Sequence, residues 1–491
     1  MKTVGRHRER VAAGLSAIVV VAGLIAGCAA TSDTTATPSV EATLGSTPVG
    51  SPRPGGSSPS TSPPAGRPIG TLDWQPEGDF ETATLEVPLD DARPGGPTVK
   101  LALIRRPAGD PAKRIGALLV NPGGPGGSGV DMVRFDGTGL PAEVLDAFDV
   151  VGFDPRGIGQ SQPLDCPSPA TVTRLEGLDP SPDTKASVAE NLGVWASIGA
   201  ACEAAAGSLL PYLSTDTVAR DMDRIRAALG EDRISYLGYS YGTYLGARYA
   251  TLFPDRLRAA VLDGPVDPTL DRLAFNERQA RGFEAALDGF LADCARDAGC
   301  PFHGGADPAA AFDALIARID KAPISTSGRA PLGPGEAMSG VFATLYWPDR
   351  RPLAEALAAA EAGDGTDLLQ FADQYWAPDS PWSLSAYAAV GCLDRPGPAD
   401  VGPWDALYRK LRTETPRVGA WVGFELTCVD WPVRAPLPAP VVPAGEPPIV
   451  VIGTTEDPAT PFSGAQPLAA ALGSGVVVTH VGVGHTAAPY G

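Results

Sequence analysis

The sequence has few basic residues, few histidines and almost no long hydrophobic runs, and each shortage excludes a class of protein. Lys and Arg number 38 against 57 Asp and Glu, which gives a formal net charge of −19. A nucleic-acid-binding protein needs a basic face, so we expect no nucleic acid as a partner. The one apolar run long enough to span a membrane lies at the extreme N-terminus, which excludes a protein with several spans. The four His and seven Cys form no close cluster with metal-ligand spacing, so no metal is expected.

The first 28 residues have the three-part pattern of an export signal. A basic start is followed by 17 uncharged residues at positions 11–27, and the run ends in Ala26-Gly27-Cys28. Small residues before a Cys are similar to a bacterial lipobox, in which the Cys thiol takes the lipid and becomes the new N-terminus. We therefore expect export and a lipid anchor at Cys28, on the outer face of the bacterial cytoplasmic membrane. If Cys28 is incidental, the segment is an ordinary signal peptide and the protein is secreted.

A stretch that is poor in apolar residues follows the signal. Residues 31–70 contain 29 Ser, Thr, Pro or Gly residues out of 40, and no aromatic residue. Such a segment cannot bury a core, so residues 29–70 are predicted to be a disordered linker that holds a folded body off the membrane.

Six cysteines remain when Cys28 is set aside, and an even number suits an oxidising compartment. The simplest hypothesis pairs sequence neighbours: Cys166 with Cys202, Cys294 with Cys300, and Cys392 with Cys428. Six cysteines allow 15 pairings, so the sequence alone does not single this one out.

The rest of the chain alternates short apolar runs with helical patterns at both of its ends. Short apolar runs at 117–120 and 148–153 are typical of parallel strands buried on both faces. Further strands are predicted at 234–237, 259–262, 449–452 and 476–478. Their order implies an α/β fold with a mostly parallel sheet and helices on both faces. Between about Thr269 and Gly445 the strand runs vanish, which predicts an inserted, mainly helical cap. The predicted boundaries are 1–28 for the signal, 29–70 for the linker, 71–268 and 446–491 for the two parts of the core, and 269–445 for the cap.

One serine lies between a predicted strand and a predicted helix with the spacing G-x-S-x-G. The segment is Gly238-Tyr239-Ser240-Tyr241-Gly242. This tight turn leaves no room for bulk beside the nucleophile, and it places the Ser hydroxyl at the carboxyl end of the sheet. A helix N-terminus there favours developing negative charge. Ser240 is therefore the predicted nucleophile.

The nucleophile needs a base, and only four histidines are available: His7, His303, His480 and His485. His485 lies in a loop after the last predicted strand and can reach the end of the sheet, whereas His480 is explained as a strand side chain. The order serine, acid, histidine places the acid after the strand 449–452, at Glu456 or Asp457. We favour His485 as the base and Asp457 as the acid.

Two backbone N–H groups are needed to hold an oxyanion. One is expected from Tyr241, directly after the nucleophile. The other is expected from the Gly-rich segment 121–127, and Gly124 is our choice. The segment lacks the Gly-Lys-Ser/Thr ending of a phosphate-binding loop.

These motifs together resemble the secreted tripeptidyl aminopeptidases, α/β hydrolases related to the prolyl iminopeptidases. The matching segments are Asn121-Pro122-Gly123-Gly124-Pro125-Gly126, residues 152–161, residues 237–246, Val261-Leu262-Asp263-Gly264, Asp457-Pro458-Ala459-Thr460-Pro461 and Gly484-His485. The resemblance implies an α/β-hydrolase fold with a helical cap, a catalytic acid at Asp457, and hydrolysis of peptides from a free N-terminus. The sequence differs from the pattern of this family at its C-terminal end. It ends six residues after His485, where relatives continue with a further helix and a Cys.

An enzyme that acts from a free N-terminus must bind the substrate ammonium group, and cap carboxylates can do this. Asp394, Glu425 and Asp430 lie near the paired Cys392 and Cys428 in sequence and are the candidates. The expected mechanism is acyl transfer without a cofactor. A carboxylesterase or lipase would use the same triad and remains an alternative. The second alternative is a non-catalytic, lipid-anchored binding protein.

Overall fold

The computed structural model describes residues 72–487 apart from positions 136, 180, 181, 183, 304, 306, 378–382, 424, 436, 437, 444 and 446. The predicted signal at 1–28, with its lipidation candidate Cys28, and the predicted linker at 29–70 lie outside the described residues. The statements below concern the part of the chain that is described.

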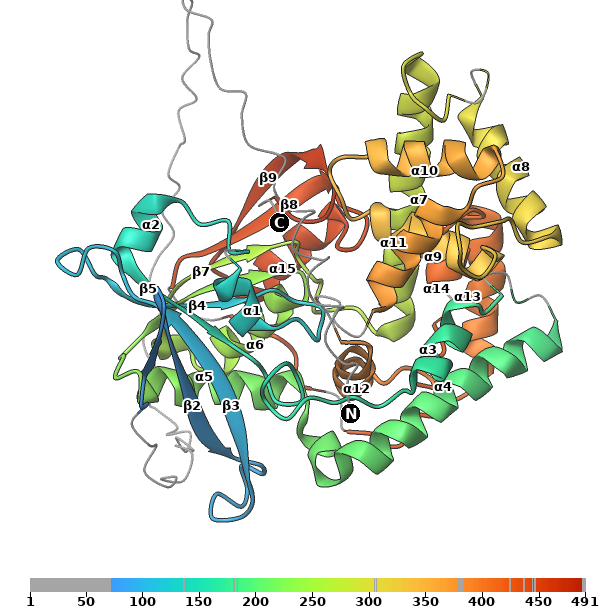
Figure 1. Ribbon diagram of the computed structural model, residues 1–491. Coiled ribbons are helices and arrows are strands. Elements are labelled where there is room, and N and C mark those ends of the chain that lie inside the picture. Colours follow the sequence, from blue (N-terminus) through green and yellow to red (C-terminus); the bar gives the residue numbers. More distant parts are fainter. Residues whose placement is uncertain are drawn as a thin grey trace, which may run out of the picture. The chain divides into compact units, whose positions relative to one another are not determined.

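A nine-stranded sheet runs through the described part in the order β1-β2-β3-β5-β4-β6-β7-β8-β9 (Figure 1). The strands are β1 (Gln75–Glu77), β2 (Phe80–Pro88), β3 (Thr98–Arg106), β4 (Gly116–Asn121), β5 (Phe148–Phe153), β6 (Ile234–Tyr239), β7 (Leu257–Asp263), β8 (Ile449–Glu456) and β9 (Gly475–Val483). From β5 to β9 all neighbours are parallel, whereas β1, β2 and β3 form an antiparallel edge. Each of the six predicted strands is present.

Helices cover both faces of the parallel strands, as the uninterrupted apolar runs require. On one face, α1 (Gly129–Arg134) and α2 (Ala142–Ala147) pack on side chains such as Val120 and Val150. On the other face, α5 (Thr215–Ala228), α6 (Tyr241–Leu252) and α15 (Ala465–Leu472) pack on Leu119 and Val151. Successive strand residues point to opposite faces, so neighbours such as Leu119 and Val120 serve the two layers. The predicted α/β fold class is confirmed.

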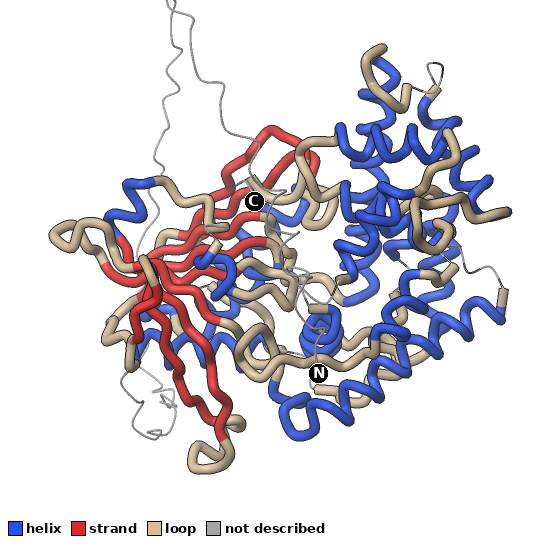
Figure 2. Tube along the Cα trace, viewed as in Figure 1, coloured by secondary structure: helices blue, strands red, loops and turns tan. Residues whose placement is uncertain are grey.

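A helical cap lies beside the sheet, between β7 and β8 in sequence (Figure 2). Its helices are α7 (Arg272–Arg296), α8 (Pro308–Lys321), α9 (Pro334–Thr344), α10 (Arg351–Glu361), α11 (Thr366–Trp376), α12 (Leu384–Asp394), α13 (Val401–Glu414) and α14 (Gly419–Gly423). Two earlier helices, α3 (Pro169–Glu176) and α4 (Lys185–Ala206), join this layer.

The inclusion of α3 and α4 corrects the boundary that the sequence suggested. Val194, Ile198 and Cys202 of α4 are buried in one cluster with Val390 and Trp404 of the cap. Part of the predicted core segment 71–268 therefore packs with the cap, because its apolar side chains face the cap helices and not the sheet. The cap is built from two separate stretches of chain.

The three predicted disulfides are all present. Cys166 pairs with Cys202, Cys294 with Cys300, and Cys392 with Cys428, with Cα atoms 4.6, 5.2 and 5.2 Å apart. All six cysteines belong to the clusters of apolar side chains that include the cap helices. The disulfides therefore fasten the cap.

One helical stretch in the described residues, Lys185–Tyr212, is long and apolar enough to cross a membrane by length and composition alone. It consists of α4 and the short 3₁₀ turn that follows. Its buried side chains, which include Val194 and Ile198, pack in the cap.

The crossing of α1 over β5 gives a test of the packing. A Cβ atom at Gly152 would lie 2.0 Å from the carbonyl oxygen of Gly129. Gly152→Ala should therefore lower the free energy of unfolding by about 3 kcal/mol, because backbone must move to admit the methyl group. Gly193→Ala, in α4, is the control. A Cβ there meets open space, so urea unfolding should show a gain of about 0.5–1 kcal/mol. Equal shifts in both variants would contradict the close crossing.

Candidate active site

The candidate site lies at the carboxyl ends of the parallel strands, where the strand order reverses. β5 lies on one side of β4 and β6 lies on the other, so the loops that leave β4 and β6 diverge. Such a reversal opens a crevice for ligands in parallel α/β sheets. Asn121 at the end of β4 is paired with Gly238 in β6, so the Gly-rich segment and the serine turn begin side by side.

Ser240 occupies a sharp, strained turn between β6 and α6. Its φ of 55° and ψ of −123° are unfavourable for a residue with a side chain. A Cβ at Gly238 would lie 2.4 Å from the Gly242 carbonyl oxygen, and a Cβ at Gly242 would lie 2.9 Å from the Asn121 carbonyl oxygen. The turn therefore requires both flanking glycines, as the G-x-S-x-G spacing predicts.

His485 and Asp457 are joined through the imidazole Nδ1. The distances from Nδ1 to Asp457 Oδ1 and Oδ2 are 2.9 and 3.0 Å. The Asp457 carboxylate is buried and also accepts hydrogen bonds from the N–H groups of Ala459, Thr460 and Thr486. A carboxylate accepts only, so Nδ1 carries the proton and the Nε2 lone pair is left for another group.

The two residues that the sequence offered as alternatives to this pair, Glu456 and His480, are both exposed. Glu456, the last residue of β8, is exposed, whereas the adjacent Asp457 turns inward. His480 lies on β9 with an exposed side chain, at the border of the same cavity as His485. Only His485 bonds to the buried carboxylate, so the geometry favours the pair that the sequence predicts.

Ser240 and His485 line one cavity of about 740 Å³ between the sheet and the cap. This volume is within the usual range for a small-ligand site. The cap contributes an aromatic wall in which Phe342 is in edge contact with Tyr346, Tyr375 and Trp421. The cap side of the cavity therefore carries an aromatic wall, and the sheet side carries Ser240 and His485.

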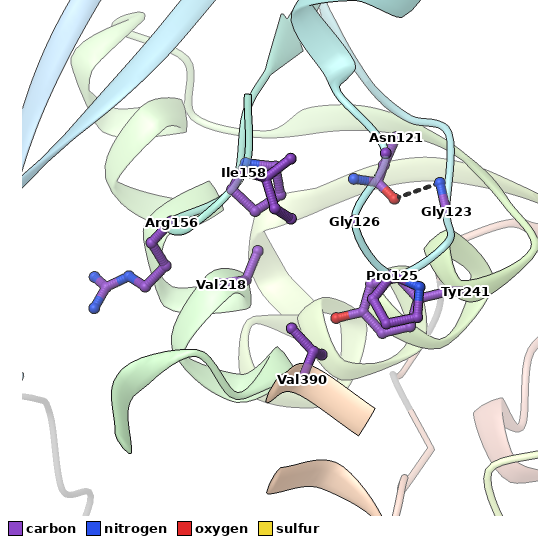
Figure 3. A pocket seen from close by; sticks show the side chains of 11 residues that line it. Asn121, Gly123, Pro125, Gly126, Arg156, Ile158, Val218, Tyr241 and Val390 are labelled. Atoms are coloured by element: carbon purple, nitrogen blue, oxygen red, sulfur yellow. Dashed lines mark hydrogen bonds between the residues drawn. The ribbon is translucent and has the colours of Figure 1, made fainter. Parts of the chain in front are cut away.

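The Gly-rich segment after β4 lies directly against the serine turn. A Cβ at Gly123 would lie 2.9 Å from Ser240 Cβ and 3.2 Å from the Tyr241 nitrogen. The Gly123 N–H donates to the Asn121 side chain at 3.1 Å, as Figure 3 shows. Among the described residues no hydrogen bond occupies the N–H of Gly124 or of Tyr241. Both of these predicted donors line the cavity.

The three candidate carboxylates for a substrate amine have different positions. Asp430 is exposed and is not among the residues that line the cavity. Asp394 lines the cavity but is buried, and its two oxygens accept from the Thr215 N–H, at 3.0 Å, and from the Thr215 hydroxyl. Burial raises the pKa of Asp394 to about 6. Asp394 is thus committed to a contact inside the protein.

Glu425 lines the cavity, and its side chain is 15% exposed. It forms an ion pair with Arg272 and accepts hydrogen bonds from Asn276 at 3.3 Å and from Thr427 at 2.8 Å. This network fixes the carboxylate on the cap side of the cavity. Of the three candidate carboxylates, Glu425 is the one that both lines the cavity and is partly exposed.

One residue that contacts His485 could not be identified from the sequence. Tyr346 lies in the loop between α9 and α10, and its carbonyl accepts a hydrogen bond from the His485 N–H at 2.8 Å. Its ring meets the imidazole edge-on, with centroids 5.4 Å apart. A backbone carbonyl has no sequence signature, so only the fold identifies this contact.

Comparisons with known proteins place the chain in a family. A family described as alpha/beta hydrolase fold matches residues 116–489. The chain is 37% identical to the serine protease Hip1 of Mycobacterium tuberculosis over 467 residues, which cover 88% of each chain. It is 38% identical to carboxylesterase B of the same species, with 82% of this chain and 80% of that one covered. It is 35% identical to a tripeptidyl aminopeptidase of Streptomyces lividans, with 81% and 76% covered.

Asp394 should make stability depend on pH. Its pKa is about 6 in the folded protein and near 3.8 when exposed, so the folded state binds the proton more tightly. The free energy of unfolding should therefore fall as pH rises from about 4 to 6, by about 3 kcal/mol from this group. Asp394→Asn keeps an acceptor and removes the ionisation, so its stability relative to wild type should increase over this window in urea unfolding.

The exposed Asp430→Asn is the control, and its difference from wild type should not vary with pH in the same window. A constant difference for Asp394→Asn would show that burial does not perturb this carboxyl group.

Proposed function

Because the chain belongs to the alpha/beta hydrolase fold family and is a serine hydrolase, we propose that it cleaves peptide bonds near a free N-terminus. The observation that carries the proposal is the His485–Asp457 pair on the same cavity as Ser240 and the cap carboxylate Glu425. The relatives named serine protease and tripeptidyl aminopeptidase support a peptide as the substrate.

In the proposed reaction Ser240 Oγ attacks the scissile carbonyl carbon while His485 Nε2 takes the hydroxyl proton. His485 then gives this proton to the leaving amine, and an acyl-enzyme remains on Ser240. A water molecule that gives a proton to the same imidazole then attacks the acyl-enzyme ester. The bond to Ser240 Oγ breaks, the peptide leaves with a free carboxyl group, and the imidazolium returns the proton to Ser240. Asp457 holds Nδ1–H throughout and stabilises the imidazolium that forms.

The negative charge of the tetrahedral intermediate needs donors that are already in place. The Gly124 and Tyr241 N–H groups supply them in this proposal, with α6 adding its positive N-terminal end. Loss of one such donor costs about 3 kcal/mol of transition-state stabilisation. No cofactor takes part in the proposed steps.

We assign the substrate ammonium group to Glu425. Glu425 borders the cavity and is partly exposed, whereas Asp394 is buried against Thr215 and Asp430 lies outside the cavity lining. An ammonium group bound to a partly buried carboxylate makes a charge-assisted hydrogen bond, which is about twice as strong as a neutral one. The cap would thus select peptides whose amino group is free.

An esterase remains the second candidate function. The relative named carboxylesterase B and the aromatic wall of the cavity both favour it. Ester and amide hydrolysis use the same nucleophile, base and oxyanion donors, so substrate tests must separate the two.

Export and lipid attachment at Cys28 are proposals that rest on the N-terminal sequence. The basic start, the uncharged run at 11–27 and Ala26-Gly27 before Cys28 support them. Three disulfides in the described residues suit an oxidising compartment.

Ser240→Ala should abolish activity, with kcat lower by about 10⁴- to 10⁶-fold, because no other group takes over the attack. The measurements are turnover of a tripeptidyl amide and labelling by a fluorophosphonate probe. Ser197→Ala, which changes an exposed hydroxyl on α4, is the control and should behave as wild type. Wild-type protein that cleaves only acyl esters would contradict the peptidase proposal. Cleavage of N-terminally blocked peptides in mid-chain would contradict its exopeptidase part.

Glu425→Gln should raise KM for peptides with a free N-terminus by about 10- to 100-fold, because a charge-assisted bond is lost. Hydrolysis of an uncharged acyl ester by the same variant measures any damage from the unpaired Arg272 and should change much less. Asp430→Asn is the matched control for the loss of one negative charge. An equal rise in KM for the peptide and the ester would contradict the assignment.

A further inference from the structure

The loop that carries His485 is held through its backbone as well as through the imidazole. Four consecutive N–H groups, from Gly484 to Ala487, donate to four different acceptors. Gly484 donates to the Glu456 carbonyl at 3.3 Å, His485 to the Tyr346 carbonyl at 2.8 Å and Thr486 to Asp457 Oδ2 at 3.2 Å. Ala487 donates to both carboxylate oxygens of Asp263, at 2.9 and 3.0 Å. The position of the imidazole therefore depends on where these acceptors lie.

Asp263 is the acceptor that also contacts the nucleophile turn. It is the last residue of β7, where it is paired with Tyr239 of β6, and it is 1% exposed. Its backbone carbonyl accepts a hydrogen bond from the Ser240 N–H at 2.8 Å. One residue therefore holds the Ser240 backbone through its carbonyl and the loop after His485 through its carboxylate.

We infer that Asp263 is a positioning residue that sets the placement of His485 relative to Ser240, and this inference rests on the proposed function of both residues. It touches neither the substrate nor the reacting atoms in the proposed mechanism. It acts through the two backbone contacts.

The local backbone shows why a strong acceptor is needed at this point. Thr486 has a φ of 66°, a left-handed conformation that a residue with a side chain adopts only when its surroundings hold it. The N–H groups of Thr486 and Ala487 are bound by two separate buried carboxylates, Asp457 and Asp263. An ionised acceptor makes a stronger bond to an N–H group than a neutral one does. Without Asp263 only one of the two carboxylates would hold the strained turn.

The space around the end of β7 is filled by the same parts of the site. A Cβ at Gly264 would lie 2.9 Å from Thr460 Oγ1 and 3.3 Å from His485 Cε1. The residue after Asp263 therefore leaves no room for a side chain between the end of β7, the acid loop and the histidine. The end of β7 and the imidazole are thus close neighbours.

The test compares Asp263→Asn and Asp263→Ala with wild type. Asn keeps an acceptor for the Ala487 N–H but loses the charge, and Ala loses both. We expect kcat for a tripeptidyl amide to fall by about 10-fold for Asn and about 100-fold for Ala, with KM within about twofold, as for a small misplacement of a catalytic group. The rate of fluorophosphonate labelling of Ser240 should fall in the same order.

Asp149→Asn is the matched control. Asp149 is a buried carboxylate near the start of β5 that accepts from the Ala108 N–H at 2.9 Å and from Arg114. It lies at the opposite end of the strands from the site, so its loss should lower Tm without changing kcat.

Each outcome decides the matter. Wild-type kcat in a folded Asp263→Ala protein would overturn the inference and leave the proposed function intact. If the Asp263→Ala protein does not fold, the Asp263→Asn variant takes its place. Wild-type kcat and unchanged fluorophosphonate labelling in that variant would overturn the inference. A fall in kcat for Asp149→Asn equal to that for Asp263→Asn would show general destabilisation and would also overturn it. Wild-type protein that neither labels nor turns over would overturn the proposed function together with the inference.

Discussion

The hydrogen bond between His485 Nδ1 and Asp457 is the interaction on which the candidate site depends. It joins the loop after β9 to the loop after β8, and it fixes which imidazole nitrogen remains available. The bond is possible because β7, β8 and β9 are parallel neighbours whose carboxyl ends meet at one edge. Hydrogen bonds from Thr460 and Thr486 complete the surroundings of the carboxylate. The sheet register therefore determines the chemistry before any substrate is bound.

The sequence predicted the parts of the fold that have strong local patterns. The parallel strands are uninterrupted apolar runs, and the serine turn needs glycines at fixed spacing, so both are visible without a structure. The antiparallel edge was not predicted, because β2 buries only Leu85 and Val87, and exposed Thr84 and Glu86 alternate with them. The assignment of α4 to the cap depends on which distant side chains it packs against, and no local pattern encodes that.

In the candidate site, too, features with a local sequence pattern were predicted, whereas contacts between distant residues were not. The nucleophile, base and acid are predicted from residue type and chain order. The structure joins His485 to Asp457 and places Ser240 and His485 on one cavity. Tyr346 and Asp263 contact the histidine loop through backbone groups that are far apart in sequence. Asp263 lies in a segment that the family resemblance includes, but its contact with Ala487 is a property of the fold alone. Among the three cap carboxylates, sequence distance from a cysteine pair gave no way to choose Glu425.

The location of the disulfides has a consequence for where the protein matures. All three cross-links stabilise the helical layer over the cavity, and in the described residues none links the strands of the sheet. The strands that lead to Ser240 and Asp457 can therefore pair while the thiols are still reduced. The cap gains its full stability only after oxidation, and it both shapes the cavity and holds the His485 N–H through the Tyr346 carbonyl. The redox state of the surroundings therefore acts on the site through the cap and not through the sheet.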